Sequence, residues 1–338
     1  MGWCYRGTGG TWKSFGLVIS SKSSRVVKIQ FPLIFEFYLL LYYLILLLLT
    51  VPELPEVETI KRDLKKAIIN RKVSGVSILW PKTVAPLSPA SFQKKIIGQE
   101  IEDVSRRAKI IRIKLTGPLD LLIHLKMTGQ LIFKPKTGRA ISGGHPQAGG
   151  LDNLPNNFTR LVFDFSDGSK IFFNDMRKFG WVRLLDDATI TQLFTNHGPE
   201  PLEKDFSVKY FQSLLSRYPK RPIKQILLDQ KIIAGIGNIY ADESCFIAGI
   251  LPTRLAGNIS VVEIKKLHRS IIAVLKHSIS KNGTSSRNYV RGDGSQGGFV
   301  PHLKVYGRAD EPCKVCGRPI KKIRLVGRGT HYCDHCQK

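Results

Sequence analysis

Residues 313–336 read CKVCGRPIKKIRLVGRGTHYCDHC and contain four of the six cysteines of the 338-residue chain. The spacing C-x2-C-x16-C-x2-C gives two knuckles, each with two thiols on one tight turn, and leaves room for a hairpin between them. Four thiolates fill the tetrahedral shell of a structural zinc ion and leave no open position for catalysis. The spacing predicts one structural Zn2+, in a compartment that keeps thiols reduced. Its expected ligands are Cys313, Cys316, Cys333 and Cys336.

The chain is strongly basic, with 52 Lys and Arg against 26 Asp and Glu and a formal net charge of +26. Residues 1–50 hold five basic residues and one acid, so the remainder keeps +22. This excess favours a polyanionic partner, either nucleic acid or an anionic membrane surface. Arg324 and Arg328 lie between the two knuckles, where their guanidinium groups suit phosphate.

The first fifty residues differ in character from the rest. Residues 37–49, FYLLLYYLILLLL, are an unbroken apolar run, but it is shorter than the ~20 residues that span a bilayer. A signal peptide fits poorly because no A-x-A site follows, and a signal-anchor is an alternative. We expect residues 1–51 to be an extension outside the mature protein, and residues 31–50 not to anchor it in a membrane.

The region from 52 to 186 predicts a helix followed by antiparallel strands. Val57, Ile60, Leu64 and Ile68 repeat with a helical period. Alternating segments separated by turns then predict a β-sandwich, and the Gly/Pro/Asn-rich stretch 135–157 predicts a mobile loop. The expected strands are 109–115, 119–125, 160–165 and 170–174, with a D-G hairpin turn between the last two.

After about residue 187 the period becomes helical, and residues 282–302 form a Gly/Ser-rich loop. The expected helices are 205–217, 222–230, 238–249 and 260–280. The fold class is therefore α+β and multidomain. The expected parts are an N-terminal antiparallel β-sandwich flanked by helices (52–186), a helical domain (187–302) and a C-terminal four-cysteine zinc hairpin (303–338).

Residues 227–243, LLDQKIIAGIGNIYADE, contain a second candidate site. Gly235 and Gly237 precede Asn238 at an expected helix start, where unpaired N–H groups can bind a phosphate oxygen. A plain packing joint between helices is the alternative. Beside a basic zinc hairpin in a basic chain, phosphate binding is the better interpretation.

Four motifs that are separated along the chain occur in an order that is typical of one enzyme family. They are PELPEVET (52–59), NDMRKFG (174–180), GIGNIYADE (235–243) and the four-cysteine hairpin with GRGT (327–330). Together they resemble formamidopyrimidine-DNA glycosylase, the bacterial-type base-excision enzyme for 8-oxoguanine and ring-opened purines. The resemblance covers residues 52–338 and is absent from 1–51. It implies that the helical domain is a helix–two-turn–helix DNA-binding domain. It also implies a DNA repair enzyme that is both a DNA glycosylase and an AP lyase.

The resemblance also implies the catalytic residues. Pro52 would attack C1′ of the damaged nucleotide through a free secondary amine and form a Schiff base, followed by β- and then δ-elimination. Glu53 would assist sugar-ring opening and proton transfer, and Glu56 would be the second acid of that helix start. Lys109 would donate a proton during elimination. Arg328 is included among the catalytic residues, and its guanidinium group would bind phosphate.

A further set of residues is expected to bind DNA. In the family's pattern Met127, Arg177 and Phe179 fill the void left by a flipped base. Lys178, Lys224 and Asn238 match phosphate contacts, with His124 beside them. Residues 282–302 match the loop that covers a flipped oxidised guanine. They contain GTSSRNYV where the family pattern is nearer GTTLRDF, so the lesion spectrum stays open.

The extension bears directly on this chemistry. With residues 1–51 attached, the Pro52 nitrogen is an amide whose lone pair is delocalised, so it cannot act as a nucleophile. Val51 lies where the family has its initiator methionine, as expected for a GTG start codon translated from a start placed too far upstream. We expect synthesis to begin at position 51 with methionine, which is then removed.

Two other functions remain as alternatives. One is an endonuclease VIII-like glycosylase for oxidised pyrimidines, against which Leu54 counts. The other is a catalytically inactive zinc-ribbon DNA-binding protein. The expected partner is damaged double-stranded DNA. We expect a monomer in the cytoplasm, associated with the nucleoid and without a stable membrane partner.

Overall fold

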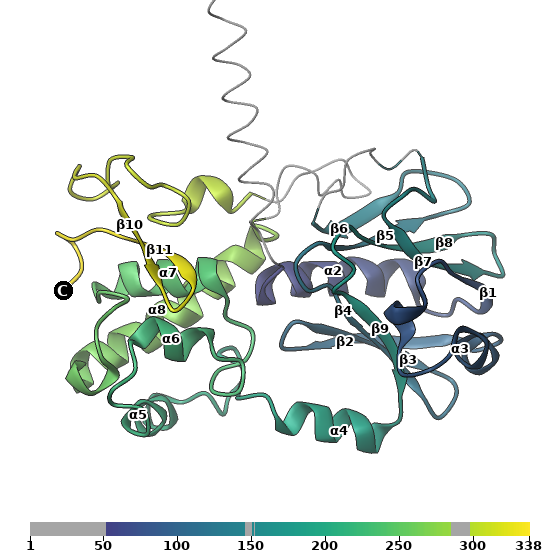
Figure 1. The fold of residues 1–338 in the computed structure, drawn as a ribbon, viewed down its shortest axis with the longest axis horizontal. Helices are drawn as coiled ribbons and strands as arrows, with labels where there is room; N and C mark the ends of the chain where they lie inside the picture. The colour runs from purple at the N-terminus through teal and green to yellow at the C-terminus, as the bar shows by residue number, and fades with distance from the viewer. Residues whose placement is uncertain (1–51, 146–150, 152, 285–297) are drawn as a thin grey trace, which may run out of the picture. The chain divides into compact units, whose positions relative to one another are not determined.

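In the described part of the chain, nine strands between Val73 and Leu185 form two antiparallel sheets (Figure 1). The structure is a computed structural model that describes residues 52–145, 151, 153–284 and 298–338. The first sheet has the order β1 (Val73–Ile78), β7 (Thr159–Phe165), β8 (Lys170–Asp175), β5 (Gly129–Lys134) and β6 (Ile141–Gly144). The second has the order β2 (Ile101–Arg107), β3 (Ile110–Leu115), β4 (Asp120–His124) and β9 (Trp181–Leu185).

Helix α2 (Leu54–Ile68) contributes one face to the core of this sandwich. Its apolar stripe of Val57, Ile60, Leu64 and Ile68 is buried in the same cluster as side chains from both sheets. The helix packs against β2 and β6. Because a helix with one buried apolar stripe has a fixed rotation about its axis, this packing also determines where Pro52 and Glu53 lie.

Three short elements in and after the sandwich were not expected from the sequence. Strand β6 forms inside the predicted loop 135–157, because backbone pairing with β5 suffices for a glycine-containing edge strand. Residues 146–150 and 152 of that loop lie outside the described residues. Helices α3 (Pro89–Ile96) and α4 (Asp187–Thr195) begin at Ser88 and Asp186, whose side chains accept a backbone N–H in the first turn. Both helices are too short to show a clear helical period in the sequence.

The second core belongs to the helical region. Its helices are α5 (Val208–Ser216), α6 (Ile223–Leu228), α7 (Asn238–Ala248) and α8 (Val261–Ser280), together with the short 3-10 helices η2 (Ala256–Asn258) and η3 (Val300–His302). A further short 3-10 helix, η1 (Pro81–Val84), belongs to the sandwich region, where it contacts β9 and α3. The four α-helices match the four predicted segments. Helix α7 packs against α8, α6 and the zinc hairpin, so nine of its eleven side chains are buried.

The C-terminal unit is a two-stranded antiparallel hairpin of β10 (Lys321–Leu325) and β11 (Arg328–Tyr332). A small apolar cluster of Phe246, Val305 and Ile320 joins Cys313 and Cys333, so the hairpin packs on α7. The structure confirms the predicted fold class of antiparallel sheets, helical domain and four-cysteine hairpin.

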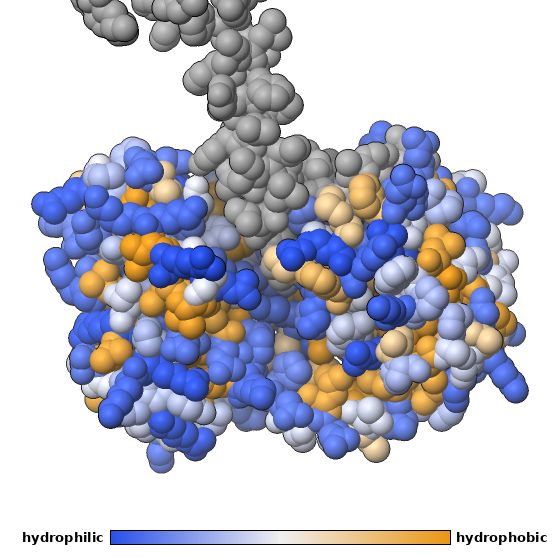
Figure 2. Space-filling view, in the orientation of Figure 1, coloured by the Kyte–Doolittle hydropathy of each residue, from blue (hydrophilic) through white to orange (hydrophobic). Residues whose placement is uncertain are grey.

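The membrane question concerns residues outside the described part. Residues 1–51, including the apolar run and the segment 31–50, are not described. Among the residues that are described, no helix combines the length and the apolar character needed to cross a bilayer. In the view of Figure 2, hydrophilic residues cover much of the described surface and hydrophobic residues form smaller groups.

Candidate active site and nucleic-acid interface

Glu53 belongs to the sequence motif 52–59 and contacts the motif 235–243. It is the N-cap residue of α2, and its carboxylate accepts hydrogen bonds from the backbone N–H groups of Ile239 (2.9 Å) and Tyr240 (3.5 Å) at the start of α7. Gly237 permits this approach, because a Cβ at that position would lie 2.2 Å from Cδ of Glu53. Pro52 is buried directly before Glu53. The expected acid therefore lies at the N-terminus of α7, with the expected nucleophile directly before it in the chain.

Lys109 reaches the same place from the turn between β2 and β3. Its Nζ donates a 2.9 Å hydrogen bond to the carbonyl of Ile236. Burial lowers the pKa of Lys109, whereas Glu53 and Glu56 raise it and Arg328 lowers it further. Burial raises the pKa of Glu53 to about 7, with an opposing effect of Lys109. An acid and an amine with shifted pKa values in contact with one loop are suited to proton transfer near neutral pH.

Glu56 is held by four hydrogen bonds. One oxygen accepts from the hydroxyl of Tyr240 (2.6 Å) and from the N–H and hydroxyl of Thr284 (2.8 and 2.9 Å). The other accepts from the N–H of Glu53 at 3.0 Å. Glu56 thus connects the start of α2 with α7 and with the beginning of the 282–302 segment, whose residues 285–297 lie outside the described part.

The three expected void-filling residues lie together. The guanidinium of Arg177 is 2.9 Å from Sδ of Met127 and lies over the ring of Phe179, 4.7 Å from its centroid. Phe179 is 52% exposed, so its ring is accessible to a partner. Asp175 holds this turn, because its carboxylate accepts from the N–H groups of Arg177 (3.2 Å) and Gly180 (2.7 Å).

Two further expected DNA contacts border this group. Lys178 has a positive φ of 59° and places its Nζ 4.1 Å from the ring centroid of Trp80. His124 accepts the N–H of Lys126 on Nδ1 at 2.9 Å, and burial lowers its pKa to about 3. The imidazole is therefore neutral near pH 7, with its remaining proton on Nε2 as a hydrogen-bond donor.

The zinc hairpin meets α7 at residues 328–331. The side-chain amide of Asn238 donates to the carbonyl of Gly329 at 3.0 Å, while the neighbouring Arg328 is exposed. The N–H of His331 donates to Asp242 at 2.9 Å. Asn238 thus bonds to the residue that follows Arg328, and both side chains are ones that the sequence predicted to contact phosphate.

The structure corrects the phosphate contact expected for Lys224. Its side chain is fully buried, and its Nζ pairs with Asp242 at 2.6 Å. The same Nζ donates to the carbonyl of Gly329 (3.0 Å) and the hydroxyl of Thr330 (2.8 Å). A buried ammonium with these partners is not available to DNA. Lys224 instead holds the hairpin that carries Arg328.

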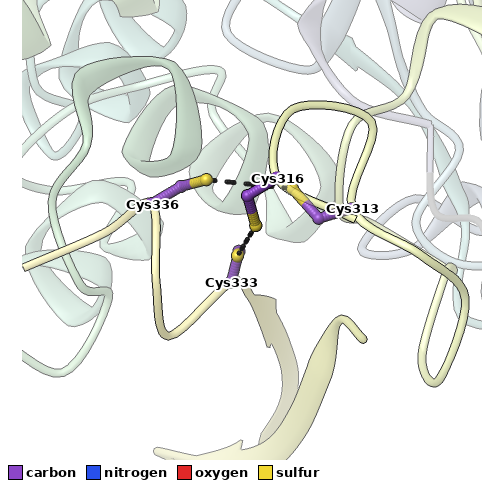
Figure 3. Close-up of side chains that lie close together, drawn as sticks. All are labelled: Cys313, Cys316, Cys333 and Cys336. Atoms are coloured by element: carbon purple, nitrogen blue, oxygen red, sulfur yellow. Dashed lines mark hydrogen bonds between the residues drawn. The ribbon is translucent and has the colours of Figure 1, made fainter. Parts of the chain in front are cut away.

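The four expected zinc ligands converge (Figure 3). Their sulfur atoms all lie within 4.8 Å of one another, with Cys313 to Cys336 at 3.9 Å and Cys316 to Cys333 at 3.5 Å. A tetrahedron with Zn–S bonds of about 2.3 Å has S···S edges of about 3.8 Å. The cluster therefore has the dimensions to hold one metal ion.

Sequence reasoning missed four polar residues that build this site. Tyr240, Asp242 and Glu243 are buried on α7, and the carboxylate of Glu243 accepts the N–H groups of residues 304–306. Glu200 is buried in the segment before α5 and pairs with Arg106 at 2.8 Å. The signal was present in GNIYADE, where two acids occur within an otherwise apolar helix in a basic chain.

Comparison with known proteins identifies the class: a DNA glycosylase with a helical DNA-binding domain and a zinc finger. Three family models match in order: the formamidopyrimidine-DNA glycosylase N-terminal domain over residues 51–182, its H2TH domain over 197–290, and a zinc finger found in FPG and IleRS over 310–338. The chain belongs to the formamidopyrimidine-DNA glycosylase family, which confirms the resemblance, and it is a DNA-binding enzyme of DNA repair.

Named relatives support this assignment over their whole lengths. The formamidopyrimidine-DNA glycosylase of Geobacillus kaustophilus is 40% identical over 290 residues, 85% of this chain and 100% of the relative. That of Carboxydothermus hydrogenoformans is 40% identical over 287 residues, with the same coverage.

Solved structures also resemble the chain, at somewhat lower sequence identity. Lactococcus lactis Fpg, in a complex with DNA that contains an abasic site, has a TM-score of 0.75 and 34% identity and covers 85% of this chain and 100% of its own. A structure of MutM with DNA that contains carbocyclic 8-oxo-G has a TM-score of 0.74 and 34% identity, with the same coverage.

Proposed function

We propose that this protein removes oxidised purines, 8-oxoguanine and formamidopyrimidines, from double-stranded DNA and then cleaves the resulting abasic site. The observation that carries the proposal is that Glu53 and Lys109 both bond to the backbone at the N-terminus of α7, with Pro52 buried directly before Glu53. The DNA in the complexes of the related Fpg and MutM proteins agrees with it.

The first step is nucleophilic substitution at the sugar. The amine of Pro52 attacks C1′, the bond from C1′ to the base breaks, and the base leaves with a proton. Glu53 is suited to protonate the ring oxygen as the sugar opens, since burial raises its pKa to about 7 and keeps a protonated fraction near neutral pH. Loss of the ring C–O bond then gives an iminium ion between Pro52 and the sugar.

Strand cleavage follows from the iminium ion. It acidifies the C2′ proton, whose removal expels the 3′ phosphate, and a second elimination expels the 5′ phosphate. Lys109 would move protons in these steps, which is supported by the hydrogen bond of its Nζ to the Ile236 carbonyl and by burial that lowers its pKa. Arg328, Asn238 and Lys178 would hold phosphates of the bound strand.

The flipped nucleotide leaves a hole in the duplex. Met127, Arg177 and Phe179 would fill it, since the exposed ring of Phe179 and the guanidinium stacked on it suit insertion between bases. We propose that one protein molecule acts on one damaged duplex, with His124 as a neutral donor at the DNA surface.

The zinc site has a structural role in this proposal. Cys313, Cys316, Cys333 and Cys336 would bind one Zn2+, which supplies a rigid crosslink between the two ends of the hairpin. With all four positions filled by sulfur, the ion would keep Arg328 in place against Asn238 without taking part in the reaction.

The nucleophile requires a free amine at Pro52. In a chain that continues to Val51, the Pro52 nitrogen is an amide and cannot attack C1′. We therefore propose that the active form begins at Pro52.

Borohydride trapping tests this proposal. A 52–338 protein is produced with methionine before Pro52 and the methionine is removed. It is compared with the full-length chain on duplexes containing 8-oxoguanine opposite cytosine, thymine glycol or an abasic site. We expect a reduced covalent adduct and release of 8-oxoguanine from the 52–338 form only. Preference for thymine glycol would indicate the endonuclease VIII-like alternative. Binding of abasic DNA without an adduct would indicate an inactive DNA-binding protein.

A further inference from the structure

We propose that Glu200 is a positioning residue for strand cleavage, because its carboxylate holds the turn that carries Lys109 and so fixes the Lys109 ammonium at the start of α7. This inference rests on the proposed function, in which Lys109 moves protons during elimination. It assigns a role there to a residue that touches neither the sugar nor a phosphate in that scheme.

Both carboxylate oxygens of Glu200 bond to the turn between β2 and β3. Oε1 accepts the backbone N–H of Ala108, the residue directly before Lys109. Oε2 accepts from Nη1 of Arg106 at 2.8 Å, and the same Nη1 donates to the carbonyl of Ala108 at 2.9 Å. The N–H and the carbonyl of Ala108 are therefore both occupied, one by the acid and the other by the guanidinium.

Ala108 needs this support because of its backbone conformation. Its φ is +52°, in the left-handed region that a residue with a Cβ adopts only at a cost in energy. Such a conformation persists where the surrounding structure holds it in more than one place. The side chains of Glu200 and Arg106 are 2% and 8% exposed, so their hydrogen bonds to the turn are shielded from water. We therefore expect the loss of either bond to displace the next residue, Lys109.

The segment that carries Glu200 is also fixed to the loop before α7. Directly before Glu200, the carbonyl of Pro199 accepts the N–H of Ala234 at 3.0 Å. Two residues further along that loop, the carbonyl of Ile236 accepts from Nζ of Lys109 at 2.9 Å. One short segment therefore bonds both to the turn that carries the amine and to the loop that carries its acceptor.

Arg106 has a second acidic partner, which makes the role of Glu200 testable. Nε of Arg106 donates to Glu58 of α2 at 3.1 Å. Replacement of Glu200 by glutamine therefore keeps the shape of the side chain and does not leave the buried guanidinium without an acid. A glutamine offers only one acceptor oxygen, and its amide group would face either the guanidinium or the N–H of Ala108, which are both donors. The turn then loses one of its two bonds.

The two stages of the lyase reaction should respond differently. In the proposed function Pro52 forms the Schiff base, and Lys109 acts in the eliminations that follow. Loss of the Glu200 carboxylate should therefore slow strand cleavage and leave formation of the Schiff base nearly unchanged. The adduct trapped by borohydride should then contain more uncleaved strand than the adduct of the wild type. A merely structural role would lower the active fraction and reduce both stages in the same proportion.

The experiment uses the form proposed to be active, which begins at Pro52, on abasic duplex DNA under single-turnover conditions. Glu200→Gln is compared with the wild type, and Glu203→Gln is the matched control, since it removes the same charge at an exposed position of the same segment. Borohydride trapping measures Schiff-base formation, and gel separation of the products measures strand cleavage. For Glu200→Gln we expect cleavage to slow about tenfold to hundredfold, as for a reacting group displaced by about 1 Å, and Schiff-base formation to slow less than about threefold.

A second variant keeps the test open if Glu200→Gln does not fold. Arg106→Lys keeps a cation beside Glu200 and Glu58 but replaces the planar guanidinium, whose separate N–H groups reach Glu58, Glu200 and the carbonyl of Ala108. We expect it to slow strand cleavage more than Schiff-base formation, as Glu200→Gln does.

A double variant tests the route of the effect. If Glu200 acts through Lys109, then Glu200→Gln causes little further loss of strand cleavage in a Lys109→Ala background. Full additivity with Lys109→Ala, equal losses in both stages, or wild-type cleavage by Glu200→Gln and Arg106→Lys would overturn the proposal. A wild-type protein that forms no adduct would instead refute the proposed function, and the role of Glu200 with it.

Discussion

The carboxylate of Glu53 accepts a 2.9 Å hydrogen bond from the backbone N–H of Ile239, which lies 186 residues later in the chain. One carboxylate thus lies at the N-termini of two helices, α2 and α7, where helix dipoles favour negative charge. Burial nevertheless raises its pKa to about 7, so the cost of removing the charge from water exceeds the help from the two helices.

Replacing Glu53 by glutamine should change the pH dependence of stability. Between the ordinary carboxyl pKa of 4.5 and about 7, the folded protein keeps a proton that the unfolded chain has released. The wild type should therefore lose stability, relative to Glu53→Gln, as pH rises through this window. Urea unfolding of both proteins at about pH 5 and about pH 8 measures this difference. A difference that does not change with pH would contradict the raised pKa.

Gly237→Ala should disturb the same contact from the other side. The new Cβ would lie 2.2 Å from Cδ of Glu53, so the start of α7 and the acid must separate. We expect a loss of about 1–3 kcal/mol in the free energy of unfolding, typical of overpacking, together with a marked loss of base release. Gly75→Ala is the matched control, since its Cβ would meet Asp164 at an ordinary 3.5 Å. Wild-type activity in Gly237→Ala would show that Glu53 does not need this position.

Lys224→Met should destabilise the protein without removing a DNA contact. It leaves Asp242 buried without its cation, which costs about 3–5 kcal/mol. The salt dependence of DNA binding by the folded fraction should stay that of the wild type. Lys178→Ala, at a proposed phosphate contact, should instead lower the slope of log K against log salt by about one. If Lys224→Met also lowered the slope of log K against log salt, Lys224 would be a phosphate contact after all.

Removal of metal should act on DNA binding through the hairpin. Chelation, or Cys316→Ser, should abolish stoichiometric zinc, and DNA affinity should fall because Arg328 loses its support. Zinc content by atomic emission and DNA affinity by fluorescence anisotropy are the measurements. Cys245→Ala is the control, since this thiol is buried on α7 outside the cluster and its loss should leave one zinc per chain. Full DNA affinity in metal-free protein would refute the role given to the hairpin.

Local sequence patterns were sufficient to predict much of the fold and the family. The cysteine spacing predicted the hairpin, the stripe of α2 predicted its buried face, and strand alternation predicted the antiparallel sheets. The motifs with Pro52, Arg177 and Asn238 predicted the family. Such features depend on residues near one another in sequence, where periodicity and turn chemistry act directly.

Other features depended on contacts between distant segments. The sequence by itself determined which residue types the site contains, but only the tertiary structure decided that Lys224 is buried against Asp242 and that Tyr240 donates to Glu56. The physical reason is that the partners and the burial of a polar side chain come from packing between segments far apart in the chain. For a lysine or an acid, those two quantities decide whether it binds DNA, transfers a proton or holds the fold together.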